Sequence, residues 1–319
     1  RKEAALSSQI EGTQATFIDV AKAEAGAVGS ETPQDYPEII NYINAINYGL
    51  KRLREDDFPL TLRLLKEIHG KILKGVRGQY KSPGSFRTSQ NWIGGASINT
   101  ASYIPPTAED MIPALTNLEK YMHDFRPMPV LIKIGLIHSQ FETIHPFLDG
   151  NGRVGRLLVT LLLCQYGLLS KPALYLSEYF KAFRSEYYDN LNAVHEKGDY
   201  EGWLKYFIEG VWLVAEEATN TAKKIKILKD KDTLKLSELS AQSSRNAIKP
   251  LENLFSNPIM TVNDVTKYTG LTYANAKKKK KKLLDLGILE LILERERNRV
   301  FAYSEYINLF KNRDSYQRM

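Results

Sequence analysis

Apolar residues recur at helical spacing along most of the chain. One such stripe runs from Ile39 to Leu50, and a second runs from Leu62 to Leu73. Because side chains three and four positions apart share one face of an α-helix, these patterns predict amphipathic helices. The same reasoning predicts helices over residues 1–24, 107–124, 128–144, 152–168, 178–196 and 200–228, with a connection at 25–34. We therefore expect a mainly α protein.

The C-terminal part combines short helices with apolar strands. Thr261 can cap a helix, and the turn from Gly270 to Thr272 precedes a second helix that ends at Gly287. Apolar runs at 288–292 and 300–303 then predict a hairpin. Helix, turn, helix and hairpin in this order resemble a winged-helix domain, a small α+β fold. We expect four regions: an N-terminal helical region (1–110), a helical core (111–222), a helical connector (223–249) and the winged-helix-like domain (250–319).

Six consecutive lysines, Lys277 to Lys282, lie in the second of these C-terminal helices and account for nearly all of the net charge of +7. Consecutive positions surround a helix, so at least one lysine should face the domain core. One interpretation is a basic helix that enters the major groove of DNA. The favoured one is a solvated face whose lysine stems lie along apolar neighbours.

Composition limits the remaining possibilities. With 319 residues, of which 43% are apolar, the chain can bury a substantial core. Its single cysteine, Cys164, excludes a disulfide framework and indicates a reducing compartment. The longest apolar stretch is too short for a membrane span, and the first residues do not resemble a signal peptide. We expect a cytoplasmic protein with no membrane partner.

The densest cluster of reactive side chains is HPFLDGNGRVGR, from His145 to Arg156. Gly150 and Gly152 predict a loop that becomes a helix at about Asn151. A helix N-terminus offers unpaired N–H groups and a positive dipole end, which together favour a phosphate. Arg153 and Arg156 stand three apart, so both can bind oxygens of the same anion.

Two further side chains give this anion site its chemistry. Asp149 suits Mg²⁺, which usually takes one carboxylate plus substrate phosphates. His145, at the loop entrance, has an ordinary pKa of about 6.5 and can accept a proton near neutral pH. The residues alone therefore predict Mg²⁺-assisted phosphate chemistry with a histidine base.

The same run resembles, without departure at a functional position, the signature of the Fic (Fic/DOC) superfamily. This resemblance implies a helical catalytic core over 111–222, a β-hairpin flap, and transfer of AMP from ATP to a Ser, Thr or Tyr hydroxyl of a target protein. It implies that His145 deprotonates the acceptor hydroxyl and that Asp149 holds Mg²⁺. It also implies that Asn151 and the amides of Gly150 and Gly152 form the anion cradle. Arg153 and Arg156 would bind the β- and γ-phosphates, and Phe147 would anchor the loop.

Segments outside the signature extend the resemblance. The stretch from Gly84 to Pro106 resembles the flap that lies over the nucleotide in Fic proteins, and Ile93 is its expected contact residue. Tyr188 and His195 resemble the residues that line the adenine and ribose pocket, with Tyr188 as the preferred stacking partner. We interpret His138 as a buried supporting residue and His69 as an ordinary residue of a helix face.

The N-terminus contains a second short motif. Ser7-Ser8-Gln9-Ile10-Glu11-Gly12 resembles the inhibitory [S/T]xxxE[G/N] motif of class II Fic proteins. Within this resemblance, Ser7, Glu11 and Gly12 are the inhibitory residues. Glu11 would pair with Arg156 and occupy the guanidinium that otherwise binds the γ-phosphate. The alternative is a surface carboxylate next to a helix-ending glycine.

Two classes of function remain open. The favoured one is a self-restrained protein adenylyltransferase whose C-terminal domain selects the target; self-modification and a homodimer are compatible with it. Removal of AMP from a modified protein is the runner-up within this class, because a glutamate near the nucleotide could orient a water. The second class is a DNA-binding regulator whose Fic-like body senses nucleotide.

Overall fold

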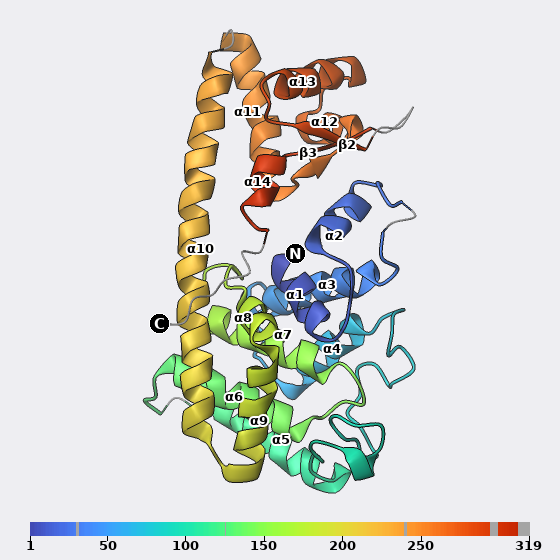
Figure 1. Cartoon of the computed structure of the whole chain (residues 1–319), viewed down its shortest axis with the longest axis vertical. Helices are drawn as coiled ribbons and strands as arrows, with labels where there is room; N and C mark the ends of the chain where they lie inside the picture. The colour runs from blue at the N-terminus through green and yellow to red at the C-terminus, as the bar shows by residue number, and fades with distance from the viewer. Residues whose placement is uncertain (30–31, 125, 239–240, 294–298, 312–319) are drawn as a thin grey trace. The chain divides into compact units, whose positions relative to one another are not determined.

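A computed structural model describes residues 1–319 except 30–31, 125, 239–240, 294–298 and 312–319 (Figure 1). The chain forms two compact units. Unit 1 comprises residues 1–16 and 33–216, and unit 2 comprises residues 17–32 and 217–319. The chain therefore leaves unit 1 after Thr16, returns to it at Pro33, and enters unit 2 again after Glu216. The four regions expected from the sequence stay a prediction beside this coarser division.

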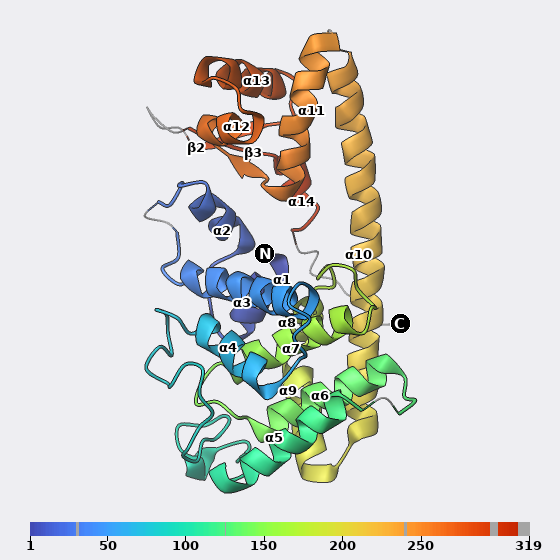
Figure 2. The same cartoon turned by 180° about the vertical axis from the view of Figure 1, so that it is seen from behind.

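Unit 1 is helical, as expected (Figure 2). Its helices are α1 (Lys2–Ile10), α3 (Tyr36–Arg54), α4 (Leu62–Ile72), α5 (Ala108–Met122), α6 (Val130–Ile144), α7 (Asn151–Gln165), α8 (Leu176–Ala182), α9 (Arg184–Lys197) and the first part of α10 (Tyr200–Ser237). Helix α7 is apolar around most of its circumference and contacts α1, α3, α4 and α6. A helix that is apolar all round forms the centre of a core, so the start of α7 is held firmly from several sides.

The first predicted helix is interrupted in the structure. The expected helix over 1–24 was wrong in its length, because α1 ends at Ile10 and a new helix, α2 (Phe17–Glu24), begins in unit 2. Gly12 has φ +95°, which ends the helix, and the backbone N–H groups of Gln14 and Ala15 donate to the carboxylate of Asp35 (2.6 and 3.1 Å). These bonds to a side chain from a distant segment replace the helical ones.

The expected flap is present, but its two arms are joined by a single β-bridge. Ile93 and Tyr103 form one antiparallel bridge, in which the N–H of Ile93 donates to the carbonyl of Tyr103 (2.9 Å). Between them lie Gly94 and Gly95, both with positive φ, and a short 3₁₀ helix, Ile98–Thr100. The glycines form the turn but leave too few paired residues for longer strands.

Unit 2 contains a three-stranded antiparallel sheet of order β1-β3-β2. Its elements are α2 and, after α10, α11 (Ala241–Ser256), β1 (Ile259–Met260), α12 (Val262–Thr269), α13 (Tyr273–Asp285), β2 (Glu290–Leu293), β3 (Val300–Ala302) and α14 (Ser304–Asn308). The order α12, α13, β2, β3 agrees with the helix, turn, helix and hairpin predicted from the sequence. Strand β1 and helix α14 were not predicted, and most of the predicted hairpin turn lies outside the described residues.

Helix α2 belongs to the core of unit 2. Ala21 and Ala27 are buried in one apolar cluster with Ile259, Val300 and Ala302 of the sheet. Thr261 caps α12 through a reciprocal capping box with Asp264, as its position before the helix predicted. A segment close to the N-terminus is thus part of the C-terminal unit. Among the described residues, no helix combines the length and apolar character needed to cross a membrane.

Candidate active site

The loop between α6 and α7 is closed by Asn151. The N–H of Phe147 donates to Asn151 Oδ1 (2.8 Å), and Asn151 Nδ2 donates to the carbonyl of Phe147 (2.7 Å). The side chain of Phe147 is fully buried, so it anchors the loop. Gly150 precedes α7 with φ +80°, which a residue with a side chain rarely adopts. The side-chain amide of Asn151 therefore shapes the loop, and the N–H groups at the start of α7 are the ones that a helix N-terminus leaves without intrahelical partners.

His145 ends α6 in the left-handed conformation, with φ +49°. Its ring Nδ1 lies 3.3 Å from the backbone carbonyl of Glu142. Since a carbonyl only accepts, Nδ1 carries the proton in the neutral ring and Nε2 is the basic atom. Burial lowers the pKa of His145 to about 4, although the bond to Glu142 partly opposes this shift. The imidazole is therefore neutral at physiological pH, which a general base requires.

The flap segment braces this loop through side chains whose roles were not anticipated. Arg87 Nε donates to the carbonyl of His145 (3.1 Å), and Asn91 Nδ2 donates to the carbonyls of His145 and Phe147 (3.1 and 3.0 Å). Both side chains are buried. They fix the backbone on either side of Pro146, and hence the position of the imidazole.

His69 of α4 is a further brace, where the sequence suggested only a helix-face residue. Its Nδ1 accepts from the N–H of Gly84 (2.9 Å), so Nε2 carries the proton and donates to the carbonyl of Asp149 (2.9 Å). The ring stacks on Phe147 with centroids 3.8 Å apart, and burial lowers its pKa to about 4. The sequence does place His69, a polar residue, on the same buried stripe as Leu65 and Ile72, and this was the signal that could have pointed to a structural role.

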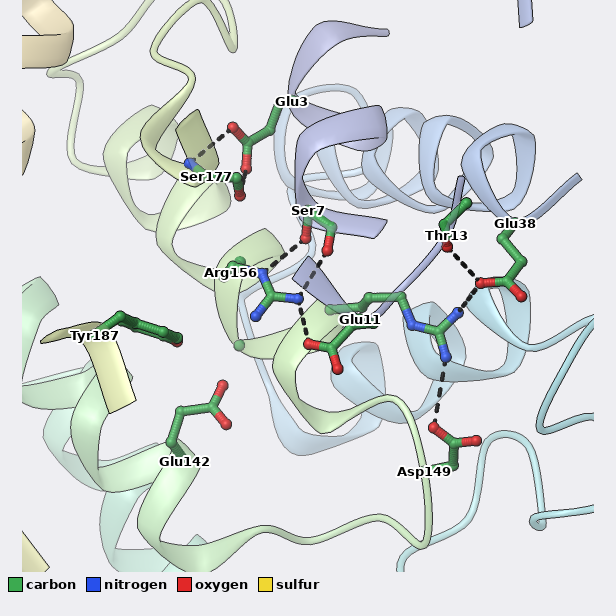
Figure 3. A network of polar contacts seen from close by, with 12 residues as sticks. Glu3, Ser7, Glu11, Thr13, Glu38, Glu142, Asp149, Arg156, Ser177 and Tyr187 are labelled. Atoms are coloured by element: carbon green, nitrogen blue, oxygen red, sulfur yellow. Dashed lines mark hydrogen bonds and ion pairs between the residues drawn. The ribbon is translucent and has the colours of Figure 1, made fainter. Parts of the chain in front are cut away.

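Arg156 donates hydrogen bonds to two residues of the N-terminal motif, Ser7 and Glu11 (Figure 3). Its Nε donates to Ser7 Oγ (2.9 Å), and its Nη2 donates to the carbonyl of Ser7 (3.0 Å) and to Glu11 Oε1 (2.6 Å). Burial alone would raise the pKa of Glu11, but the charge and hydrogen bond of Arg156 lower it on balance. In return the pKa of the guanidinium is raised, although burial opposes this. The pair is ionic.

Glu11 also lies against the start of α7. A methyl group added at Gly152 would overlap Glu11 Oε1 and crowd the guanidinium of Arg156. The carboxylate therefore occupies space at a helix N-terminus, where an anion is favoured. Gly12, the last residue of the motif, ends this segment with its positive φ.

Arg153 has a carboxylate partner that the sequence did not indicate. Glu38 of α3 is buried, and its Oε2 lies 3.3 Å from Arg153 Nη1. The same oxygen accepts from Thr13 Oγ1 (3.0 Å) and Arg77 Nη2 (3.3 Å), and Arg77 Nη2 also donates to the carbonyl of Glu11 (3.0 Å). Both arginines of the signature therefore have carboxylate partners, and Glu38 connects Arg153 to the segment that follows Glu11.

Asp149 lies beside Arg153 at the mouth of the loop. Its Oδ1 is 3.5 Å from Arg153 Nη2, and 36% of its side chain is exposed. Gly78 approaches it so closely that an added methyl group would overlap Asp149 Oδ2. Among the described residues, no group of three or more histidine, cysteine or acidic side chains gathers in a way that could hold a metal ion.

The residues expected at the adenine and ribose pocket lie on α9 and the flap. His195 stacks on Tyr103, the bridge partner of Ile93, with centroids 3.8 Å apart. Tyr188 is half-buried, with the guanidinium of Arg184 over its ring at 5.7 Å. Burial raises the pKa of Tyr188, and the charge of Glu11 adds to this, so its hydroxyl lies within electrostatic reach of the site.

His138 is a buried supporting residue, as interpreted from the sequence. One ring nitrogen lies 3.1 Å from the carbonyl of Gly155, and the other lies 2.8 Å from the hydroxyl of Tyr187. These contacts connect α6 to α7 and α9. His138 therefore holds together the helices that position His145 and Arg156.

Fold and site together define a class of protein: a mainly helical protein in which a loop bearing a histidine leads into a helix N-terminus with two buried arginines. The sequence model described as Fic/DOC family matches residues 59–163, and the model described as Fic/DOC family N-terminal matches residues 1–51. The chain belongs to the Fic/DOC family.

Curated relatives match between 57% and 69% of the chain. A protein adenylyltransferase Fic from Aedes aegypti is 29% identical over 189 residues, which are 57% of this chain and 34% of that protein. A probable protein adenylyltransferase from Aquifex aeolicus is 26% identical over 257 residues, 69% of this chain and 76% of that protein. The chain thus matches about a third of the length of the mosquito relative.

Solved structures share the fold. A Fic family protein from Desulfovibrio desulfuricans superposes with a TM-score of 0.61 at 17% identity, covering 95% of this chain and 86% of that one. A Fic domain containing signaling protein from Bacteroides thetaiotaomicron gives a TM-score of 0.51 at 19% identity, covering 68% and 87%. At these identities the likeness concerns the fold alone.

Proposed function

We propose that this protein transfers AMP from ATP to a hydroxyl of a target protein, and that Glu11 restrains the transfer. The observation that carries the proposal is the position of Glu11, whose carboxylate lies against Gly152 and pairs with Arg156 at the start of α7. An anion site already filled by a carboxylate favours an anionic substrate, which must compete for the same donors. The names of the relatives, protein adenylyltransferases, support the same activity.

The proposed chemistry assigns each group one task. His145 Nε2 takes the proton from the acceptor hydroxyl, whose oxygen then attacks the α-phosphorus in line with the departing pyrophosphate. The N–H groups at the start of α7, with Arg153 and Arg156, bind the phosphates. Ile93 and Tyr103 cover the nucleotide, and Tyr188 with His195 flanks its base and ribose.

Asp149 would hold Mg²⁺. Its carboxylate is a hard oxygen ligand, it is partly exposed at the mouth of the anion site, and one carboxylate plus substrate phosphates is the usual way in which proteins bind this ion. When bound, Mg²⁺ supplies positive charge that stabilises the phosphate oxygens.

The test is a cycle of four proteins: the wild type, Glu11→Gly, Arg156→Ala and the double variant. Each is incubated with Mg·ATP, and AMP adducts are measured on the intact protein by mass spectrometry. Glu11→Gly should raise AMP incorporation because Arg156 becomes available to the γ-phosphate. The gain should vanish in the double variant, since relief acts only through that arginine. His145→Ala in the Glu11→Gly background should lower the rate by roughly 10²–10⁴-fold with nucleotide binding retained.

Other results would change the proposal. A Glu11→Gly protein no more active than the wild type would contradict inhibition by Glu11. If Glu11→Gly instead lost the ability to remove AMP from a modified protein, the glutamate would belong to the reverse reaction, in which it orients a water.

A further inference from the structure

Glu142, three residues before His145, has a buried carboxyl group with no assigned role. Only 6% of the residue is exposed, and its Oε1 has no hydrogen-bond partner within the part of the chain that the structure describes. Its Oε2 lies 3.9 Å from His145 Nδ1. Figure 3 shows the carboxyl group pointing towards the side of the site where Arg156 and Glu11 lie, with no interaction drawn to it. A buried polar atom without a partner costs free energy, so its retention calls for an explanation.

The neighbouring helix provides space for this carboxyl group. A methyl group added at Gly155, in the interior of α7, would overlap Glu142 Oε1 and touch Phe141. Glycine inside a helix is unfavourable by about 1 kcal/mol relative to alanine. The packing of α6 against α7 is therefore arranged around Glu142 as well as around the anion site at the start of α7.

The groups that face Glu142 set its charge near neutral pH. Burial raises its pKa to about 7; the positive charge of Arg156 opposes this shift, and the negative charge of Glu11 adds to it. On α9, Tyr187 also faces it, and the charge of Glu142 helps to raise the pKa of that hydroxyl. Of these neighbours Arg156 is a cation, Glu11 is an anion and His145 is neutral at pH 7.

We propose that Glu142 is a positioning residue which, when ionised, strengthens His145 as a base. The inference rests on the proposed function for its consequence, but the contact between Glu142 and His145 can be tested without it. When His145 Nε2 takes the acceptor proton, the O–H bond breaks, an N–H bond forms and the ring becomes a cation. A carboxylate 3.9 Å from Nδ1 stabilises that cation, and a neutral carboxyl group does not. Glu142 neither gains nor loses a proton in the step.

The reactivity of His145 Nε2 should therefore depend on pH. Below pH 7 Glu142 is protonated, and the charge developing on His145 meets a neutral neighbour. As the pH rises through about 7 the carboxylate forms, and the reactivity of Nε2 should increase. His145 itself does not cause the change, because its own pKa, about 4, lies well below. Removal of Glu11 takes away one charge that raises the pKa of Glu142, so in Glu11→Gly the change should occur at lower pH.

The experiment measures carbethoxylation of His145 by diethyl pyrocarbonate in the full chain, with the modified peptide quantified by mass spectrometry between about pH 5.5 and 9. The wild type should show a roughly tenfold rise in rate with an inflection near pH 7, since an opposite charge at this distance shifts a pKa by about 1–3 units. Glu142→Gln, which has nearly the same shape and no charge, should keep the low rate throughout. Glu142→Asp, whose carboxylate is withdrawn from His145, should show a smaller rise.

Glu3→Gln is the matched control. Glu3 is also buried with its pKa raised to about 7 by burial, but its carboxylate accepts from Ser177. The Glu3→Gln variant should leave unchanged the inflection near pH 7 in the rate at which His145 is carbethoxylated. An unchanged inflection in Glu142→Gln, or its loss in Glu3→Gln as well, would overturn the proposal.

The pH dependence of AMP transfer gives a second measurement. In the Glu11→Gly background, Glu142→Gln should remove the rise of kcat with pH and leave KM for ATP unchanged. If no variant transfers AMP while the carbethoxylation result holds, the proposed function fails and the coupling between Glu142 and His145 stands. If transfer occurs with an unaltered pH profile, the positioning role fails and the proposed function stands.

Discussion

Arg153 and Arg156, three positions apart on α7, each have a buried or half-buried carboxylate partner from the N-terminal part of the chain. Arg156 pairs with Glu11 at 2.6 Å, and Arg153 pairs with Glu38 at 3.3 Å. Removing one partner of a buried ion pair costs about 3–5 kcal/mol, because the remaining charge is left uncompensated. A bound polyphosphate would satisfy both guanidinium groups in place of the carboxylates. Without either kind of anion, the two buried guanidinium groups would lose these compensating charges.

Another buried carboxyl group makes the stability of unit 1 depend on pH. Burial raises the pKa of Glu3 from 4.5 to about 7. A raised pKa means that the folded state binds the proton more tightly, so this stabilisation is complete below pH 4.5 and is lost as the pH rises through 7. Glu3→Gln, which is always neutral, should be more stable than the wild type by only about 1 kcal/mol at pH 5 and by about 3 kcal/mol at pH 8, at about 1.4 kcal/mol per pKa unit.

Urea unfolding at the two pH values measures the difference. Glu3→Gln would also lose part of the bonding to Ser177. An effect of equal size at pH 5 and pH 8 would show that this lost bonding, and not ionisation, dominates.

At the scale of elements, the loop between α6 and α7 is held by side chains from two segments, α4 and the flap, that are far from it in the sequence. His69 of α4 binds the carbonyl of Asp149, while Arg87 and Asn91 of the flap segment bind the carbonyl of His145. The loop has positive φ at His145 and Gly150, so its conformation is not one that the local sequence favours by itself. Its geometry depends on these braces.

His69→Ala should therefore loosen the loop. The variant leaves the N–H of Gly84 and the carbonyl of Asp149 without partners and removes the stack on Phe147, which together should cost about 2–4 kcal/mol. Hydrogen exchange of the amides in residues 145–150 should accelerate. His123→Ala is the control, because that ring contacts the carbonyl of Leu60 and not the loop. Similar acceleration in both variants would indicate a general loss of stability.

The sequence predicted those features of the fold and the site that residues adjacent along the chain determine. HPFLDGNGRVGR encodes a loop, a helix start and its charged groups within one continuous run, so the start of α7 at Asn151 could be foreseen. The partners of Glu38 and His69 could not be foreseen, because each residue lies on an ordinary amphipathic helix and contacts a residue 115 or 80 positions away; for His69 the sequence offered only its place on a buried stripe. The break after Ile10 was missed for the same reason, since Asp35 supplies the bonds that replace the helix.

The lysine run on α13 gives a test of the DNA-binding alternative. Lys277, Lys278 and Lys281 are exposed, whereas Lys280 lies over the ring of Phe301 at 4.1 Å, which agrees with a solvated face and one covered stem. We expect weak duplex binding, read by fluorescence anisotropy, that decreases equally when three lysines of α13 or three of α10 are changed to glutamine. The α10 set, Lys223, Lys224 and Lys226, is also exposed and removes the same charge.

A different result would support the alternative that the protein is a DNA-binding regulator. If only the α13 variant lost affinity, with a salt dependence reduced by about 0.9 per lost phosphate contact, α13 would be a specific nucleic-acid surface.

At the scale of the whole molecule, the path of the chain joins the two units more than once. Residues 1–16 belong to unit 1, residues 17–32 belong to unit 2, and the chain then returns to unit 1. Ala21 of α2 is buried against the sheet of unit 2, only a short distance along the chain from Glu11. The integrity of unit 2 therefore depends on a segment near the N-terminus.

Ala21→Asp should destabilise unit 2 and leave unit 1 folded. Burying a carboxylate in that apolar cluster should cost about 3 kcal/mol or more. The three tryptophans, Trp92, Trp203 and Trp212, all lie in unit 1, so their fluorescence reports that unit alone. Circular dichroism should show an early thermal transition that tryptophan fluorescence does not. Ala23→Asp, at a less buried position of α2, is the control, and coincident shifts in both signals would contradict the independence of the units.

Under the proposed function, the two attachments of the segment around Glu11 would also determine how a nucleotide competes with it. Glu11 is tethered by α1 on one side and by α2 on the other, so its local concentration at Arg156 is set by chain geometry and lies in the millimolar range for a short flexible link, or higher for a held one. A free nucleotide would face that concentration at every encounter. Raising the nucleotide level would then change the outcome little, whereas freeing one end of the tether would lower the local concentration of the competitor at once.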